Sequence, residues 1–263
     1  MSVETTPRPQ VAPGRITQGR VLHSEWIKMR SVRSTRLTLA FAVAALVGLG
    51  PLIALFAPAQ GLDPVAISTT GYLFAQLAVG ALGVLVVSGE YSTGMIRVSL
   101  TAVPRRLPVL WAKTAVYAVV TWVSMTAAAV AAFLLSQAIL ASRGLATASL
   151  GDPGVARTVL GSATYLTVLA VLSVAIGALT RATAGGVAAI LGILLVLPVL
   201  TRVLPSTTAD TVARYLPGNA GQAIFTLHQS SATLSPWAGL TVLFLYAGVA
   251  LAGAALMLRR RDV

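Results

Sequence analysis

The sequence contains no cysteine, and that absence removes several kinds of chemistry from this chain. Without cysteine there can be no disulfide, no thiolate metal site and no thiol nucleophile. Histidine is almost as scarce, because only His23 and His228 occur, far apart in the sequence. We expect both to be solvated and unable to form a metal site or an acid–base pair. The chain is therefore predicted to bind no metal or cofactor itself and not to be an enzyme.

Charge is also sparse, since charged residues make up 10% of the 263 residues while 56% are hydrophobic, with a mean hydropathy of +0.84. A water-soluble domain of this length carries less apolar surface. Apolar runs of about 20 residues recur, enough to cross a hydrocarbon core of about 30 Å as a helix. They lack the period-two alternation of barrel strands. We predict an all-α membrane protein with six transmembrane helices, at about residues 38–56, 71–88, 114–141, 158–179, 185–204 and 237–258.

Two of these spans contain proline. Pro51 lies in the first run and Pro198 in the fifth. Proline has no backbone N–H and its ring clashes with the preceding turn, so it bends a helix. The first and fifth spans are therefore expected to be bent.

Lysine and arginine are unevenly distributed among the connecting segments. With the N-terminus in the cytoplasm, fifteen of the 19 lie on the cytoplasmic side and four on the outside, namely Arg143, Arg157, Arg202 and Arg214. This asymmetry orients membrane proteins during insertion. It predicts a multi-pass protein of the cell (inner) membrane with both termini cytoplasmic. Basic flanks that contact anionic membrane lipid account for the net charge of +12, so no nucleic-acid partner is expected.

The first apolar run has an alternative interpretation as a signal peptide, because Ala57-Pro58-Ala59 resembles a cleavage site. The run follows 37 residues, however, whereas signal peptides have short positively charged n-regions. We therefore expect an uncleaved span. Residues 1–19 are rich in proline and polar residues and are predicted to be a disordered cytoplasmic tail, followed by one membrane domain over residues 20–263.

Residues 20–36, before the first span, combine a narrow apolar stripe with many cations. Leu22, Trp26 and Met29 recur at helical spacing. This pattern predicts an interfacial helix at the inner surface, with Trp26 at headgroup depth. A solvated linker is the alternative.

The cytoplasmic segment between the second and third spans is too apolar for a solvated turn. Met95, Ile96, Ser99, Leu100 and Val103 share one helical face. Pro104 is expected to end this helix and Pro108 to begin the next. The apolar face can press against the bilayer or the chain's own spans, or it can dock a partner. In the second case, charges at both ends would make the contact specific: Glu90, Arg97, Arg105 and Arg106.

A long outer segment, residues 205–236, joins the last two spans and contains two modestly apolar pieces, residues 211–216 and 220–227. A segment that dips into the membrane must be buried in protein or line a cavity, because unpaired backbone cannot face lipid. We predict short re-entrant helices here that close the outer mouth of a pathway.

These segments together resemble the permease subunits of ABC-2 type transporters. The similarity rests on Gly89-Glu90-Tyr91-Ser92-Thr93-Gly94-Met95-Ile96-Arg97, on Leu100-Thr101-Ala102-Val103-Pro104-Arg105-Arg106 and Lys113, on Glu25-Trp26-Ile27-Lys28-Met29-Arg30-Ser31 and on Tyr215-Leu216-Pro217-Gly218-Asn219-Ala220-Gly221. In that family the first of these segments is a coupling helix that docks into an ATPase subunit. The third is an interfacial elbow helix, and the last lies where re-entrant external helices occur.

The resemblance implies a role for three sets of residues. An ATPase subunit would dock on Glu90, Tyr91, Met95, Ile96, Arg97, Leu100, Arg105 and Arg106. The elbow helix would include Glu25, Trp26, Lys28 and Arg30. An external gate would include Leu216, Pro217, Asn219, Ala223 and Ile224.

The resemblance also implies partners, namely a cytoplasmic ABC ATPase that binds ATP and Mg, and a second permease chain as homodimer or heterodimer. Neither Lys28 nor Lys113 follows a glycine, so this chain lacks the P-loop that cradles phosphates. Hydrolysis is expected on the partner. Spans rich in Ala, Val, Leu, Ser and Thr favour export of a hydrophobic or amphipathic substrate.

Two other classes of function remain as alternatives. An ion-coupled secondary transporter usually places a titratable group near the bilayer midplane, but all seven acidic residues fall outside the predicted spans. A non-transporting scaffold or assembly protein would show the same helices, so the helix count does not separate it from a permease.

Overall fold

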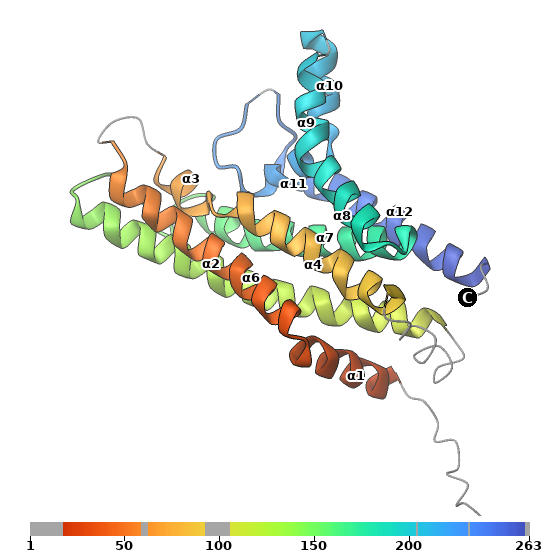
Figure 1. Cartoon of the computed structure of the whole chain (residues 1–263). Coiled ribbons are helices and arrows are strands. Elements are labelled where there is room, and N and C mark those ends of the chain that lie inside the picture. The colour runs from red at the N-terminus through yellow and green to blue at the C-terminus, as the bar shows by residue number, and fades with distance from the viewer. Residues whose placement is uncertain (1–17, 59–62, 93–105, 204, 231, 261–263) are drawn as a thin grey trace, which may run out of the picture.

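The computed structural model describes residues 18–58, 63–92, 106–203, 205–230 and 232–260. All regular structure in these ranges is helical (Figure 1). Six segments are long and apolar enough to cross a membrane, which confirms the predicted multi-pass, all-α architecture. They are α2 (Arg33–Phe56), α3 with α4 (Pro64–Thr69 and Tyr72–Ser92), α6 (Arg106–Ser142), α7 (Val155–Thr180), α8 to η2 (Thr183–Val203) and α12 (Pro236–Arg260).

The helices extend beyond the apolar runs that predicted them. Helix α2 begins at Arg33 and α6 at Arg106, five and eight residues before the expected starts. Helix α6 has 37 residues and is therefore about 55 Å long, well over the thickness of a hydrocarbon core. Apolar content marks the part of a helix that meets lipid, whereas the helix itself continues into the polar flank.

Helix α3 was not predicted from the sequence. Asp63 caps it, because its side chain accepts hydrogen bonds from the backbone N–H groups of Val65 and Ala66, and Pro64 occupies the first helical position. Both are standard signals for a helix start. A break at Thr70 and Gly71 separates α3 from α4. A side chain at Gly71 would come within 2.6 Å of the Leu46 Cα, so glycine permits close contact with α2 here.

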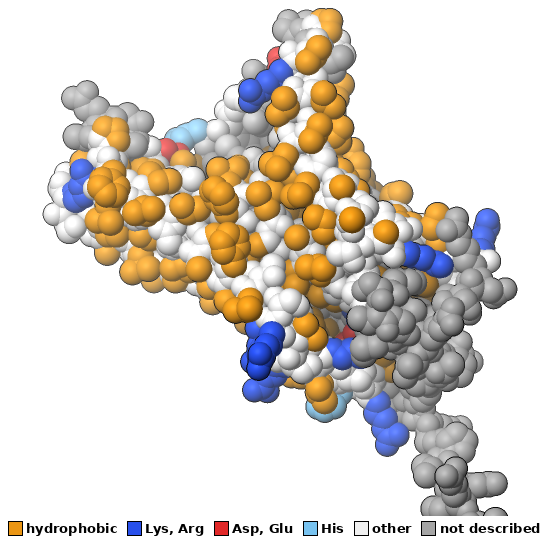
Figure 2. All heavy atoms as spheres, in the orientation of Figure 1, with side chains coloured by type: hydrophobic (Ala, Val, Ile, Leu, Met, Phe, Trp, Pro, Cys, Tyr) orange, Lys and Arg blue, Asp and Glu red, His pale blue; other side chains and the backbone are white. Residues whose placement is uncertain are grey.

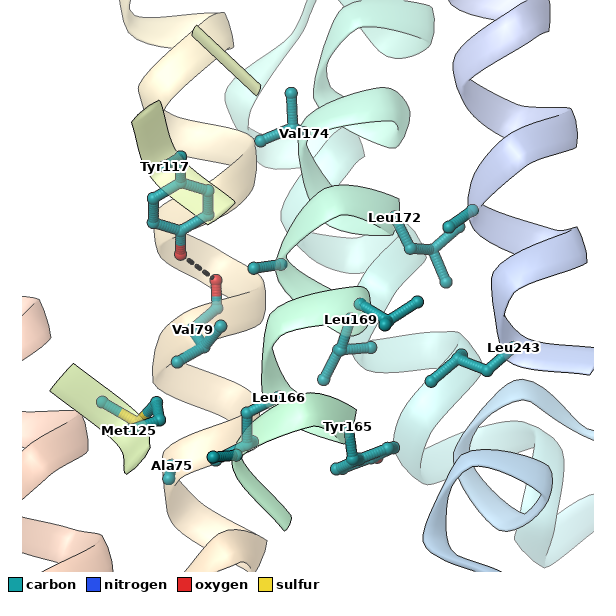
Figure 3. Packing of buried hydrophobic residues seen from close by; sticks show 14 of the residues in the cluster. Ala75, Val79, Tyr117, Met125, Tyr165, Leu166, Leu169, Leu172, Val174 and Leu243 are labelled. Carbon is teal, nitrogen blue, oxygen red and sulfur yellow. Dashed lines mark hydrogen bonds between the residues drawn. The ribbon is translucent and has the colours of Figure 1, made fainter. Parts of the chain in front are cut away.

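Helix α7 forms the centre of the bundle. In its most apolar window 72% of residues are buried, against 22% in α2 and 17% in the segment from α8 to η2. Side chains from α4, α6 and α12 pack around it (Figure 3). The Tyr117 hydroxyl on α6 donates a 2.7 Å hydrogen bond to the Val79 carbonyl on α4, which satisfies a polar group inside this core. The space around α7 is therefore filled by the chain's own side chains.

The fifth span is not one regular α-helix, because its helix type changes around its proline. It consists of α8 (Thr183–Leu191), a π-helical turn η1 (Gly192–Val196), α9 (Leu197–Leu200) and a 3-10 turn η2 (Thr201–Val203). The π turn lies directly before Pro198, and such turns commonly accompany a kink. Figure 1 shows α9 and the next helix, α10 (Ser206–Tyr215), leaving the bundle. In contrast, α2 continues through Pro51 to Phe56.

The bundle has two distinct ends. At one, here called the α1 end, lie α1 (Gln18–Ser31), the end of α4, the start of α6 and the C-terminal end of α12 (Figure 1). The other, the α3 end, carries α3, residues 143–154 and the start of α7. In Figure 2 hydrophobic side chains cover much of the visible surface between these ends, and Lys and Arg side chains lie toward the extremities. This distribution is the one that a lipid-facing bundle requires.

Candidate functional site

Helix α1 (Gln18–Ser31) packs beside the start of α6 at the α1 end of the bundle. The predicted helix is present, but it begins two residues earlier than expected, within the predicted tail, and ends before Val32, whose extended backbone separates it from α2. Val21 of α1 packs with Val109 and Ala112 of α6. The face carrying Leu22 and Trp26 is exposed, as an interfacial helix requires.

Glu25 lies on the packed face of α1 and forms a buried ion pair. Its Oε2 is 2.5 Å from the Lys113 Nζ of α6, and its Oε1 is 2.8 Å from the Lys28 Nζ. The Glu25 and Lys113 side chains are only 3% and 7% exposed, whereas Lys28 is 32% exposed and Arg30 lies on the surface. A buried charge of this kind is tolerated only when it is paired. Glu25 therefore joins α1 to α6.

The sequence placed Glu25 on a surface helix and did not predict this pair. Eighty-eight residues separate Glu25 from Lys113, so no local spacing connects them. One signal was available, because Glu25 follows Val21 by four positions and thus shares its face of the helix.

The predicted ATPase-docking residues lie between α4 and α6. Glu90 and Tyr91 belong to the last turn of α4, and Arg106 is the first residue of α6. The remaining residues of that set, Met95, Ile96, Arg97, Leu100 and Arg105, lie outside the described part of the chain, as does the predicted coupling helix, residues 92–103, beyond its first position. The coupling helix stays a prediction. The described helices fix where the segment is attached, which is at the same end as α1.

The segment between the last two spans forms three short helical pieces, of which the last two lie toward the α3 end and the first follows α9 away from the bundle (Figure 1). They are α10 (Ser206–Tyr215), α11 (Pro217–Gln222) and η3 (Ala223–Phe225). Of the predicted gate residues, Pro217, Ala223 and Ile224 are buried, while Leu216 and Asn219 are half-buried. Asn219 donates a hydrogen bond of 2.9 Å to the Ala213 carbonyl. These five residues thus belong to one packed unit.

An arginine and a group of aromatic residues anchor that unit to the bundle. Arg157, in the first turn of α7, donates to the Ile224 carbonyl at 2.6 Å and satisfies a carbonyl where η3 ends. The ring of Phe225 lies 4.8 Å from Tyr72 and 5.4 Å from Tyr165, centroid to centroid. The Tyr72 hydroxyl also donates to the Gln222 Oε1 at 3.0 Å. Helices α11 and η3 are therefore held to both α4 and α7.

Close backbone approach adds to this anchoring. Gly239, near the start of α12, lies so close to the Ala220 carbonyl of α11 that a Cβ would collide with it. Gly221 lies against Tyr165 and Leu243, where a Cβ would come within 2.6 Å of Leu243. Both glycines are required by space rather than by backbone angles. Helix α11 can sit in this position only because these residues have no side chain.

Arg143 satisfies carbonyls at the end of α2, as Arg157 does at the end of η3. Its Nη1 donates to the carbonyls of Ala54 and Ala57, at 2.7 and 3.0 Å, where α2 ends. Helix C-termini carry unsatisfied carbonyls and partial negative charge, so a guanidinium is favourable there. Two of the four cations predicted to lie outside thus have a structural role.

Cavities open at the α3 end beside these helices. One of about 490 Å³ is lined by Asp63, Asp152 and His228, and a neighbouring one of about 340 Å³ reaches Tyr72 and Gln222. The His228 Nε2 lies 3.7 Å from the Asp63 carboxylate, with the His228 side chain 82% exposed. His23 is exposed on α1. Within the described ranges no three His, Cys, Asp or Glu side chains gather into a group that could hold a metal ion.

Comparison with other proteins adds no identification. No model of a known protein family matches this chain, and no curated protein matches it.

Proposed function

We propose that this chain is the transmembrane permease subunit of an ATP-binding cassette exporter of the ABC-2 type. A separate cytoplasmic ATPase subunit binds ATP and Mg and supplies the energy. The proposal combines the six apolar helices with the residues that resemble the family's elbow helix, coupling helix and external helices, which follow one another in the family's order.

The single observation that carries the proposal is the ion pair between α1 and α6. Residues 93–105 connect directly to the first turn of α6, and Lys113 lies two helical turns further on. Through Lys113, α6 is tied to Glu25 of α1. A force on the connecting segment would therefore move α6 and α1 together. A docked ATPase could therefore act on both helices through one attachment.

In this mechanism the ATPase contacts residues 90–106 differently in its open and closed states. That difference in contact free energy is what biases the permease between two conformations. Helices α4 and α6 flank the docking segment, and α7 packs against both. Closure of the ATPase would thus tilt α4 and α6 around α7 and alternate access to the two sides.

A second permease chain would complete the pathway. The core around α7 is filled, whereas α2 and the segment from α8 to η2 leave most of their apolar side chains uncovered. Exposed residues on the fifth span include Leu195, Val199 and Leu200. These two helices are the least buried of the six and offer apolar surface to a second copy or to lipid. A path between two chains lined by such side chains suits a hydrophobic or amphipathic substrate.

Among the side chains that the structure describes, the buried acidic residue does not suit ion coupling within a span. Glu25 is a buried acidic residue, but it belongs to α1 rather than to a spanning helix and is paired with two lysines. A coupling carboxylate must exchange its proton or ion with the pathway. The Glu25 carboxylate is instead paired with lysines and holds α1 against α6.

Orientation is the first test, because the ATPase can reach residues 93–105 only if the α1 end is cytoplasmic. The chain has no cysteine, so single exposed positions can be changed to cysteine and labelled with a membrane-impermeant maleimide. In intact cells we expect labelling at Asp152→Cys and Asp210→Cys, and none at His23→Cys or Arg259→Cys until the membrane is permeabilised. All four positions are exposed, so burial cannot imitate the result. The reverse pattern would eliminate the permease proposal.

A further inference from the structure

A polar pocket of about 280 Å³ lies between α10, α11 and the loop that follows η3. It is distinct from the cavities beside Asp63, although it shares Gln222 and Thr226 with the nearer of them. Its lining contains two charged side chains, Asp210 and Arg214, and the polar side chains of Asn219, Gln222, Thr226 and Thr233. The volume is somewhat below that of pockets that enclose drug-sized ligands, so it fits a head group rather than a whole lipid.

Arg214 in this pocket has a buried donor without an acceptor. Its Nε is inaccessible to solvent and makes no hydrogen bond, while its guanidinium lies over the Tyr215 ring, 5.4 Å from the centroid. Buried polar groups in folded proteins are almost always satisfied by protein, water or ligand. A planar guanidinium held against an aromatic ring presents its remaining N–H groups in a fixed direction, which suits a carboxylate or phosphate.

Asp210 precedes Arg214 by one turn of α10, so both charges lie on the same side of this helix. Opposite charges at this spacing often pair, yet among the ion pairs of the described residues none joins Asp210 to Arg214. Asp210 is exposed, and Arg214 is only half-buried. The pocket therefore offers one negative and one positive group, separated by about 6 Å at their Cβ atoms and not neutralised by each other.

We propose that this pocket binds a zwitterionic head group of the phosphoethanolamine kind, with the phosphate at Arg214 and the ammonium at Asp210. A simple anion or cation meets one favourable and one unfavourable charge here, whereas a zwitterion can meet both charges favourably. Asn219 and Gln222 frame the site and are fixed, because Asn219 bonds to the Ala213 carbonyl and Gln222 accepts from Tyr72. The idea that this head group belongs to the transported substrate rests on the proposed function. Binding of the head group does not, because it requires no ATPase.

The test uses the full chain, purified in an uncharged maltoside detergent, with two probes. Binding of soluble glycerophosphoethanolamine is measured by calorimetry, and retained phosphatidylethanolamine is counted against phosphatidylglycerol by native mass spectrometry. We expect Arg214→Gln to weaken binding of the zwitterion by about tenfold or more, since it removes a charge-assisted contact. Arg214→Lys should fall between it and the wild type, which shows that loss of folding is not the cause. Arg202→Gln, an exposed arginine on η2 outside the pocket, should have no effect.

Asp210→Asn makes the test specific for a zwitterion. This variant should lose the preference for glycerophosphoethanolamine over glycerol phosphate, because the ammonium partner is gone while Arg214 remains. Binding of the soluble probe alone identifies a free head group as ligand, and retention of the lipid alone identifies a membrane lipid; either supports the site. Absence of both, or unchanged binding in Arg214→Gln, would overturn it. If the chain carries no ATPase subunit when it is isolated from its native membrane, yet still binds the head group, the proposed function is contradicted while this site stands.

Discussion

Replacing Glu25 with alanine is expected to release α1 from α6 and to lower the free energy of unfolding by about 3 kcal/mol or more. The carboxylate lies 2.5 Å from the buried Lys113 ammonium, so its removal leaves a desolvated cation without that partner. The loss should appear as a lower thermal unfolding temperature in detergent. Lys28→Ala provides the matched control. It removes the other contact of the same carboxylate, but Lys28 is partly exposed, and exposed pairs contribute only about 0–1 kcal/mol.

A local readout separates release of α1 from general destabilisation. Ala112 of α6 is buried against Val21 of α1, and the substitution Ala112→Cys would introduce the chain's sole thiol. Labelling of this thiol should be slow in the parent and fast after Glu25→Ala. The double variant Glu25→Met with Lys113→Met should recover part of the lost stability, because an apolar pair often replaces a buried ion pair without loss. An unchanged unfolding temperature with the introduced thiol still protected would show that the ion pair does not hold α1.

Reversing the charges of Glu90→Lys and Arg97→Glu together is expected to abolish stimulation of the partner's ATP hydrolysis by this chain. These residues flank the predicted docking face, and like charges placed across an interface cost several kcal/mol. Membrane insertion and the thiol-labelling pattern should be unchanged. Hydrolysis is measured with the purified complex in lipid vesicles, with and without the substitutions.

Arg260→Glu is the control for this double variant, since it reverses an exposed charge at the end of α12 that is not among the predicted docking residues. It should leave stimulation intact. If the double reversal hydrolyses ATP at the parent's stimulated rate, the ATPase does not dock on this segment.

The positions of the six spans could be predicted because lipid imposes a simple requirement on sequence. Each span needs about 20 apolar residues, and those runs are visible without a structure. The start of α3 was also readable, since Asp63 and Pro64 form an ordinary helix start. It was overlooked because the apolar run begins only at Gly71.

Which helix occupies the centre could not be predicted. The most buried span, α7, has a mean hydropathy of 2.1 in its apolar window, while the span from α8 to η2 reaches 2.4 and is the least buried. Lipid and protein interior are both apolar, so hydropathy cannot distinguish a lipid-facing helix from a core helix. Packing decides it, through close approaches such as those of Gly71 to α2 and of Gly239 to α11.

The polar contacts of the candidate site were equally hidden. Glu25 with Lys113, Arg157 with the Ile224 carbonyl and Arg143 with the end of α2 all join residues more than 60 positions apart. The distribution of Lys and Arg along the sequence predicted a side of the membrane for Lys113, Arg157 and Arg143, but no partner. Only the folded chain shows that Lys113 holds α1 and that the two arginines satisfy carbonyls at helix ends.

The mass of the intact complex would show whether an ATPase accompanies this chain in its native membrane. The chain would be purified from its native membrane in mild detergent and weighed by native mass spectrometry. We expect a complex with two permease chains, at least one of them this chain, and ATPase chains that carry a P-loop. The Glu90→Lys and Arg97→Glu variant should lose the ATPase. A stable particle that contains this chain without any ATPase would show that it is not a permease of this type.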